Sequence, residues 1–333
     1  MRAWLAAGLL FLAHPLSAET FTDSAGRTVT VPTTVNKVLA AGPPASVVLY
    51  TLAPDKLLGW VRRPDDDAKA YLAKPYRELP AQLRLTGREP ADPAAIKALG
   101  AGLIVDFGTV DGRYAGIAER TQAATGIAYV LIDGALGRTA TAYRELGRMM
   151  QAGPRAETLA GRSQAMLDEM AARIGGSSRR KVLVVRGPDG DEAYGAGAFT
   201  EEIIKPAGGA NVAESWGTGI VKQITPAKVR EADPDVVIAT DPFFLETVGR
   251  NPDWKQVPAI AGGRLYAAPR QPFGWLDEPP SVNRLIGLRW LAGLLHPQRF
   301  DGDLRETVRA FYSLFYQVDL SPAQLDTLLA NGR

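Results

Sequence analysis

The chain has 333 residues, 38 Lys and Arg against 36 Asp and Glu, and no cysteine. Its length suits two domains of ordinary size. The lack of cysteine excludes disulfides, thiolate metal sites, cysteine nucleophiles and a lipid anchor on an N-terminal cysteine. Because basic and acidic residues are interspersed without a long basic run, we expect no nucleic-acid partner.

Residues 1–18 are typical of a secretory signal peptide. Arg2 provides a positive start, Leu5–Ala13 is apolar but too short to span a bilayer, and Leu16-Ser17-Ala18 supplies small residues for cleavage before Glu19. We therefore predict a soluble periplasmic protein that starts near Glu19 and is not lipid-anchored. Without Arg2, the formal net charge of +2 becomes +1.

The two histidines limit metal chemistry. His14 lies in the signal segment, so His296 is the single imidazole of the mature chain. One histidine forms neither a nitrogen-rich metal site nor a catalytic pair. We expect His296, which precedes Pro297, to cap the end of a helix, and we expect no metal site and no cofactor.

Short apolar strands alternate with helices in the first half of the chain. The pattern predicts strands at 37–41, 56–60, 102–107 and 128–132, and helices at 45–52, 94–99 and 113–125. Such alternation is typical of a parallel sheet covered by helices.

The second half repeats this rhythm, with strands predicted at 181–186, 235–240 and 265–268 and helices at 200–207, 226–232 and 280–295. Between the halves, Leu159, Met166, Leu167 and Met170 form one apolar stripe of a long helix. We predict an α/β fold with two parallel-sheet lobes and a ligand cleft between them. The expected division is an N-terminal lobe at 19–152, a connecting helix at 153–176 and a C-terminal lobe at 177–333.

Four segments in order resemble the periplasmic substrate-binding proteins of the iron-siderophore, haem and cobalamin importers. They are the Asp-x-x-Gly-Arg turn in residues 21–32, then residues 37–40, 98–105 and 232–238. The resemblance covers roughly residues 21 to 300. It implies two α/β lobes joined by one long helix, and a role in delivering a solute to an ABC permease in the inner membrane.

The segment 273–292 resembles a subgroup that includes molybdate or tungstate binders and nickel- or iron-chelate binders. It contains Phe273-Gly274-Trp275 and Pro279-Pro280-Ser281. Family members often carry one glutamate on each lobe to contact the permease. Here the nearest positions are Ala94 and Ala227, so this mode of docking is in doubt.

The cleft is expected where the carboxyl ends of the strands of both lobes face each other. Arginines there would bind anionic oxygens, backbone N–H groups of residues 42–45 would add positive potential, and aromatic faces would cover the organic part of a ligand. The predicted ligand-binding residues are Pro43, Trp60, Arg62, Arg186, Tyr194, Trp216, Arg270 and Trp275.

We therefore expect a non-enzymatic, monomeric capture protein for a metal chelate such as an iron-siderophore. A molybdate or tungstate binder of the same fold is the first alternative. A metal-tetrapyrrole chelatase is an alternative of another class, although that chemistry needs a base in the cleft.

Overall fold

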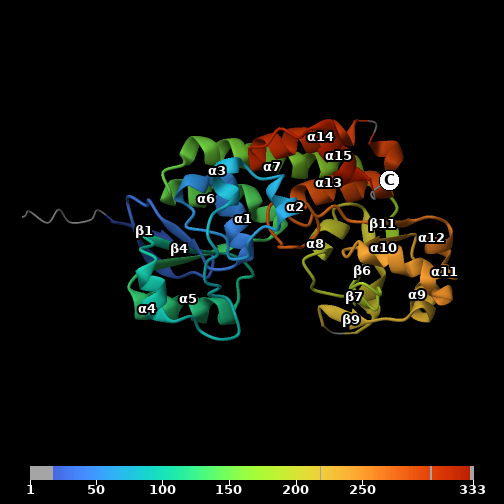
Figure 1. Cartoon of the computed structure of the whole chain (residues 1–333), viewed down its shortest axis with the longest axis horizontal. Coiled ribbons are helices and arrows are strands. Elements are labelled where there is room, and N and C mark those ends of the chain that lie inside the picture. The colour runs from blue at the N-terminus through green and yellow to red at the C-terminus, as the bar shows by residue number, and fades with distance from the viewer. Residues whose placement is uncertain (1–17, 218, 301, 331–333) are drawn as a thin grey trace, which may run out of the picture.

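The computed structural model describes residues 18–217, 219–300 and 302–330. The predicted signal peptide, residues 1–18, lies outside the described residues except for Ala18. Figure 1 shows two α/β lobes side by side, with a layer of helices that runs along both. The predicted fold class is therefore confirmed.

An antiparallel hairpin of β1 (Ala18–Thr22) and β2 (Thr28–Pro32) precedes the first lobe. Asp23 forms its turn, because its carboxylate accepts hydrogen bonds from the N–H groups of Ala25 and Arg27, both at 3.0 Å. The Arg27 guanidinium pairs with this carboxylate and donates to the Tyr129 carbonyl at 2.8 Å. The Asp-x-x-Gly-Arg turn thus joins the hairpin to the sheet of the first lobe.

The sheet of the first lobe is parallel and consists of β3 (Val38–Ala40), β4 (Leu103–Gly108) and β5 (Ala128–Asp133), in that order. Its residues are almost all buried, as expected for a parallel sheet with both faces covered. The helices of this lobe are α1 (Pro43–Leu52), α2 (Asp66–Lys69), α3 (Lys74–Arg77), α4 (Pro93–Ala98) and α5 (Gly112–Thr125).

The strand predicted at 56–60 is wrong. Leu57 and Trp60 each form a single bridge, to Val38 and Ala81 respectively. A 3-10 turn occupies Pro54–Lys56 immediately before this segment. The backbone of Trp60 then exchanges hydrogen bonds with residues 80–82, both at 2.9 Å, so the segment leaves the β3 edge after one bridge.

The sheet of the second lobe is mixed. β8 (Gly209–Asn211), β6 (Arg180–Arg186), β10 (Val236–Ala239) and β11 (Leu265–Ala267) are parallel, whereas β7 (Glu192–Tyr194) and β9 (Val221–Gln223) are antiparallel to their neighbours. A hairpin connects β6 to β7, and Gly187 and Gly190 within it have positive φ. The prediction of a purely parallel sheet is therefore wrong at this edge. The helices here are α8 (Glu201–Ile204), α9 (Pro226–Ala232), α10 (Phe243–Thr247), α11 (Pro252–Lys255) and α12 (Pro258–Ala261).

A helical layer joins the lobes and consists of α6 (Thr139–Met149), α7 (Gly153–Ile174), α13 (Arg284–Leu295), α14 (Leu304–Phe311) and α15 (Pro322–Leu329). With 22 residues, α7 is about 33 Å long. Leu159, Met166 and Met170 of the predicted stripe are buried, and Leu167 is partly buried. Figure 1 shows α7 in the helical layer above the lobes, and α13 above the second lobe.

The C-terminal helices return to the first lobe. The Gln324 side chain donates to the Ala70 carbonyl at 2.8 Å, and the Tyr50 hydroxyl donates to the Tyr316 carbonyl at 2.5 Å. Residues 304–329, which the sequence assigned to the second lobe, therefore also contact the first. One hydrophobic cluster accordingly runs from β3 and α1 through α7 to α13 and α14.

Helix α13 begins later than predicted, at Arg284. The Ser281 hydroxyl donates to the Pro44 carbonyl at 2.9 Å, and the Asn283 side chain donates to the Pro279 carbonyl at 3.0 Å, so residues 281–283 form a turn. Trp290 is buried in the core. His296 follows the helix, with its imidazole 3.3 Å from the Gly208 carbonyl.

No helix within the described parts of the chain is both long enough and apolar enough to cross a membrane.

Candidate ligand-binding site

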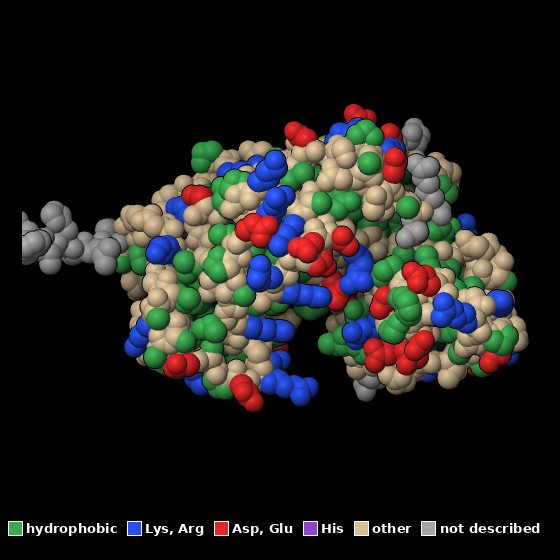
Figure 2. All heavy atoms as spheres, in the orientation of Figure 1, with side chains coloured by type: hydrophobic (Ala, Val, Ile, Leu, Met, Phe, Trp, Pro, Cys, Tyr) green, Lys and Arg blue, Asp and Glu red, His purple; other side chains and the backbone are tan. Residues whose placement is uncertain are grey.

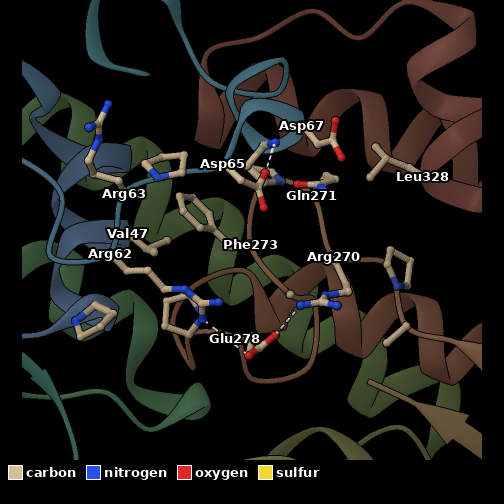
Figure 3. A pocket seen from close by; sticks show the side chains of 18 of the residues that line it. Val47, Arg62, Arg63, Asp65, Asp67, Arg270, Gln271, Phe273, Glu278 and Leu328 are labelled. Carbon is tan, nitrogen blue, oxygen red and sulfur yellow. Dashed lines mark hydrogen bonds and ion pairs between the residues drawn. The ribbon is translucent and has the colours of Figure 1, made fainter. Parts of the chain in front are cut away.

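A cavity of about 470 Å³ lies between the two lobes (Figure 3). The first lobe contributes the start of α1 and residues 60–68. The second contributes Pro242, residues 267–274 and residues 278–279, while Thr327 and Leu328 come from α15. The segments after β3, β10 and β11 all reach the cavity, as expected for the carboxyl ends of strands in an α/β protein.

Two arginines from opposite lobes meet in this cavity. Arg62 follows Trp60 in the first lobe, and Arg270 follows β11 in the second. Glu278 lies between them, with one carboxylate oxygen 3.5 Å from Arg62 Nη1 and the other 3.1 Å from Arg270 Nη2 (Figure 3). All three side chains are more than a third exposed, so solvent and solutes have access to them.

Apolar and aromatic side chains line the other side of the cavity. Figure 3 shows Phe273 close to Val47, while Leu328 lines the cavity at another side. Behind Phe273 lies the Trp60 ring, with 5.8 Å between the ring centroids. The indole N–H of Trp60 donates to the Tyr76 carbonyl at 2.9 Å. Trp60 therefore forms the floor of the cavity and has no free donor for a ligand.

The start of α1 offers fewer donors than its position suggests. Gly42 is the N-cap and makes no side-chain capping bond, and Pro43 and Pro44 occupy the first helical positions. Proline has no N–H group. The prediction that the backbone of residues 42–45 supplies a set of N–H donors is therefore wrong at two of its four positions.

An ion pair between a buried arginine and a partly exposed glutamate connects the two lobes away from the cavity lining. Arg284 is 1% exposed and donates to Glu202 at 3.1 Å, to the Ser281 carbonyl at 3.2 Å and to the Gly134 carbonyl. The Glu202 carboxylate also accepts from the backbone N–H of Leu136. Since Gly134 and Leu136 follow β5 and Glu202 belongs to α8, this network fixes the two lobes to each other.

Basic side chains dominate the surface around the cleft. Figure 2 shows Lys and Arg along both sides of the notch between the lobes, with acidic side chains between them. The cavity itself is lined by Arg62, Arg63 and Arg270 and by Asp65, Asp67 and Glu278. Asp65 already caps α2, because it accepts from the Ala68 N–H at 2.7 Å. This distribution favours a ligand with anionic groups.

Within the described residues, no group of three or more His, Asp or Glu side chains is placed to hold a metal ion.

Residues 121–272 match the family described as periplasmic binding protein. A solute-binding protein of an ABC transporter from Sulfurospirillum deleyianum DSM 6946 is 27% identical, with a TM-score of 0.85 over 93% of this chain and 99% of that one. In this segment and in its fold, the chain is similar to periplasmic binding proteins. No curated protein matches it.

Two further neighbours of this periplasmic binding protein were solved with ligands. A molybdate periplasmic binding protein from Haemophilus influenzae, bound to molybdate, is 20% identical, with a TM-score of 0.72 over 91% of this chain and 99% of that one. The CeuE protein of Helicobacter pylori, in a Ni-His complex, is 18% identical, with a TM-score of 0.69 over 93% and 99%. At these identities the likeness concerns the fold.

The family and the fold define the general role. Periplasmic binding proteins of this type are the solute-binding components of ABC transporters and deliver their ligands to the permease. They are not enzymes, so the chelatase alternative is not retained.

Four of the eight predicted ligand-binding residues of the binding protein line the cavity. They are Pro43, Trp60, Arg62 and Arg270. The other four lie elsewhere, for three different reasons.

Trp275 is completely buried in the core. Its indole N–H donates to the Tyr312 hydroxyl at 3.1 Å. Its aromatic neighbour Phe273 takes the position in the cavity that the sequence suggested for Trp275.

Arg186 and Tyr194 form a cluster beside the cavity. The Arg186 guanidinium lies 5.2 Å from the centre of the Tyr194 ring and pairs with Glu192 at 3.6 Å. The Tyr194 hydroxyl donates to the partly buried carboxylate of Asp277. The two residues thus contact the cavity wall indirectly, through the residue that precedes Glu278.

Trp216 lies on a different surface, next to α9. The Lys228 ammonium is 4.6 Å from the centre of its ring, and both residues line a separate surface pocket.

Several cavity residues are absent from the predicted set, above all Glu278. Glu278 precedes Pro279 in a loop, because α13 starts only at Arg284, and its side chain faces the cavity. Arg63, Asp65 and Asp67 belong to a charged run that reads equally well as a solvated surface. The sequence around Leu328 does not indicate a cavity residue, because Leu328 reaches the cavity only through the return of α15 to the first lobe.

The helices that precede β4 and β10 carry Ala94 and Ala227, and both alanines are exposed. The nearby Asp92 carboxylate is engaged as the cap of α4, accepting from the Ala94 N–H at 3.0 Å. These helix starts therefore present methyl groups at the positions where the resemblance leads one to expect glutamates.

Proposed function

We propose that this binding protein captures an anionic metal chelate of the iron-siderophore class and delivers it to its ABC permease. The observation that carries the proposal is the meeting of Arg62 and Arg270, from opposite lobes, in one cavity. Guanidinium groups bind carboxylates and other anionic oxygens with directed, charge-assisted hydrogen bonds. A ligand between these two side chains contacts both lobes at once.

The apolar side of the cavity supports an organic ligand. Phe273, Val47 and Leu328 offer apolar contacts next to the arginines, and ligand sites of proteins combine such surface with a few directed polar groups. A volume of about 470 Å³ lies within the usual range for small-molecule sites, about 300–1,000 Å³. In this proposal the donor atoms on the metal belong to the chelate, and the protein contacts its outer oxygens and carbon surface.

A molybdate or tungstate ion is the second candidate, because a structural neighbour was solved bound to molybdate. The same arginines would serve an oxyanion. A bare tetrahedral ion, however, would leave Phe273, Val47 and Leu328 without a contact and much of the cavity filled with water. We therefore rank the chelate first.

A thermal-shift panel tests the proposal. The probes are a ferric trihydroxamate, ferric citrate, haem, cobalamin, nickel with histidine, molybdate and tungstate. A ligand present at about 100 times its dissociation constant stabilises the folded state by about 2.7 kcal/mol, which raises Tm by several degrees. We expect a shift with an anionic chelate. If only molybdate or tungstate produces a shift, the second candidate replaces the first, and a panel without any shift contradicts the proposal.

Matched arginine variants locate the binding site. Arg62→Ala and Arg270→Ala should reduce or abolish the shift, because each removes a guanidinium from the cavity. Arg186→Ala removes the same charge from the neighbouring cluster outside the lining and should retain the shift. Equal losses in all three variants would indicate a general electrostatic effect instead of a specific site.

We also propose that the chain is exported and cleaved before Glu19. The order of a positive residue, an apolar stretch and small residues in positions 1–18 supports this. The mass of the protein from the periplasmic fraction tests it. A mature form that begins at Glu19 is expected, and an uncleaved form in the cytoplasm contradicts the proposal.

A further inference from the structure

The carboxylate of Glu278 occupies the position in which the two cavity arginines meet. Its two oxygens are divided between the lobes, one toward Arg62 and the other toward Arg270. A side chain that belonged to the scaffold would be buried and fixed by several partners. Glu278 is 44% exposed, and Arg62 and Arg270 are 67% and 39% exposed, so this bridge can open without unfolding its surroundings.

The backbone under Glu278 is held firmly, in contrast to its side chain. The Glu278 carbonyl accepts from the Gly274 N–H at 2.7 Å, and the Asn283 side chain donates to the next carbonyl, of Pro279, at 3.0 Å. The preceding Asp277 is partly buried and accepts from the Tyr194 hydroxyl. The loop therefore presents the Glu278 carboxylate at a defined place on the cavity wall.

We propose that Glu278 is an internal substitute for the ligand. In the empty protein it neutralises Arg62 and Arg270, and an anionic ligand must displace it to reach them. This inference rests on the proposed function, because it concerns the same cavity. Glu278 is then a specificity-determining residue. The exchange of its carboxylate for the ligand selects anionic ligands, because only these can take its place at the two arginines.

Charge selection follows from the groups that line the cavity. Three arginines and three acidic residues face it, so the lining is formally neutral while Glu278 remains in place. A neutral ligand cannot replace the Glu278 carboxylate at the two arginines, so contact with them adds little to its binding free energy. A ligand with two or more anionic oxygens can satisfy both guanidiniums and swing Glu278 toward solvent. The ligand class is therefore a polyanionic chelate that presents carboxylate or catecholate oxygens to the arginines.

The exchange also bears on lobe closure. With Glu278 in place, Arg62 of the first lobe already contacts the loop of the second lobe. A ligand that binds both arginines therefore breaks the Arg62–Glu278 contact and connects the two lobes itself.

Neutralising Glu278 tests the exchange directly. Wild type, Glu278→Gln and Asp67→Asn are titrated by calorimetry with citrate, ferric citrate and molybdate. Asp67→Asn is the matched control, because Asp67 lines the same cavity and carries the same charge but forms no ion pair with Arg62 or Arg270 in the structure. We expect Glu278→Gln to lower the Kd for the anionic probes about tenfold, since two exposed ion pairs no longer compete with the probe. Asp67→Asn should change the Kd less than threefold.

Three results would overturn the inference. One is an equal gain in both variants, which reflects net charge alone. Another is an unchanged Kd in Glu278→Gln. The third is weaker binding in Glu278→Gln, which makes Glu278 a contact of the ligand. Glu278→Ala repeats the measurement without a carboxamide that could still accept from the arginines.

The inference and the proposed function fail in different ways. If the chelate panel shifts Tm and the shift depends on Arg62 and Arg270, but Glu278→Gln binds no tighter, the function stands and the exchange is wrong. If Glu278→Gln gains affinity for citrate while no chelate shifts wild type, the exchange stands and the cargo is wrong. If neither protein binds any anionic probe, both are wrong.

Discussion

The loop at residues 269–279 and helix α13 follow each other in the chain but use their arginines in opposite ways. Arg270 in the loop is 39% exposed and shares one carboxylate with Arg62. Arg284 at the start of the helix is 1% exposed and donates to Glu202 and to two backbone carbonyls. An arginine whose donors are satisfied inside the protein stabilises the fold, whereas one that is exposed and partly paired remains available to a ligand.

Removing Arg284 should have the largest effect on the fold. Arg284→Ala leaves the Glu202 carboxylate and the Gly134 and Ser281 carbonyls without their partner. Because the Glu202 side chain is 34% exposed, the cost comes mainly from the two buried carbonyls that lose a donor, about 2–4 kcal/mol together. We expect a loss of that size in the free energy of unfolding, measured by urea denaturation of the ligand-free protein. A loss below about 1 kcal/mol, the level of a surface ion pair, would remove the distinction between the two arginines.

The contact between loop and helix depends on a glycine. A Cβ on Gly287 would lie 1.9 Å from the carbonyl oxygen of Trp275. Gly287→Ala must therefore move the loop or the helix, with an expected cost of about 1–3 kcal/mol. Gly293→Ala in the same helix is the control, since its Cβ would meet no backbone atom outside its own helix within 4 Å, but the end of the Arg289 side chain at 2.8 Å and the Phe300 Cβ at 4.0 Å. The control should be neutral or slightly stabilising, because alanine favours a helix more than glycine does. Similar Tm values for both variants would contradict the tight packing.

Asp277 gives the loop a pH dependence of smaller size. Burial raises the pKa of this carboxyl above its usual value, although the Tyr194 hydrogen bond lowers it; Glu278 raises it further, while Arg186 and Arg270 lower it. A raised pKa in the folded state means that ionisation costs stability. The penalty is absent below the unfolded pKa, about 3.9, and develops as pH rises through the folded pKa.

Asp277→Asn should therefore be more stable than wild type at neutral pH, and this gain should vanish below about pH 4. Asparagine still accepts a hydrogen bond from Tyr194, so the variant isolates the charge. Denaturation curves at a series of pH values measure the difference. A variant that is less stable than wild type at neutral pH would show that the Asp277 charge stabilises the loop.

Much of the fold follows from local patterns in the sequence. Buried strands such as β4 and β5 consist almost entirely of apolar residues, and the stripe of α7 marks a helix packed along one face. The misread segment at 56–60 has the same apolar character. Whether it joins the sheet depends on residues 80–82, which form hydrogen bonds with the backbone of Trp60. Such pairing cannot be predicted from the segment alone.

Only part of the site could be predicted, because some of its residues are placed by contacts between segments that are far apart in the sequence. Arg270 could be placed because it follows a strand, and strand ends mark the cleft. Trp275 could not, because the partner of its indole N–H, Tyr312, lies in the C-terminal segment that returns to the first lobe. Glu278 could not be placed either, because it lies in a loop whose course depends on the turn before α13.

The smallest expected effect on stability completes the comparison of the two arginines. Arg270→Ala removes one exposed ion pair, to Glu278 at 3.1 Å, and such pairs contribute about 0–1 kcal/mol. We expect the urea midpoint of the ligand-free protein to change little, under the conditions used for Arg284→Ala. Because the pair is exposed, this small effect should fall further at 1 M salt, where the Debye length is about 3 Å. A loss comparable to that of Arg284→Ala would make Arg270 part of the scaffold, and the cavity would then have one ligand arginine fewer than proposed.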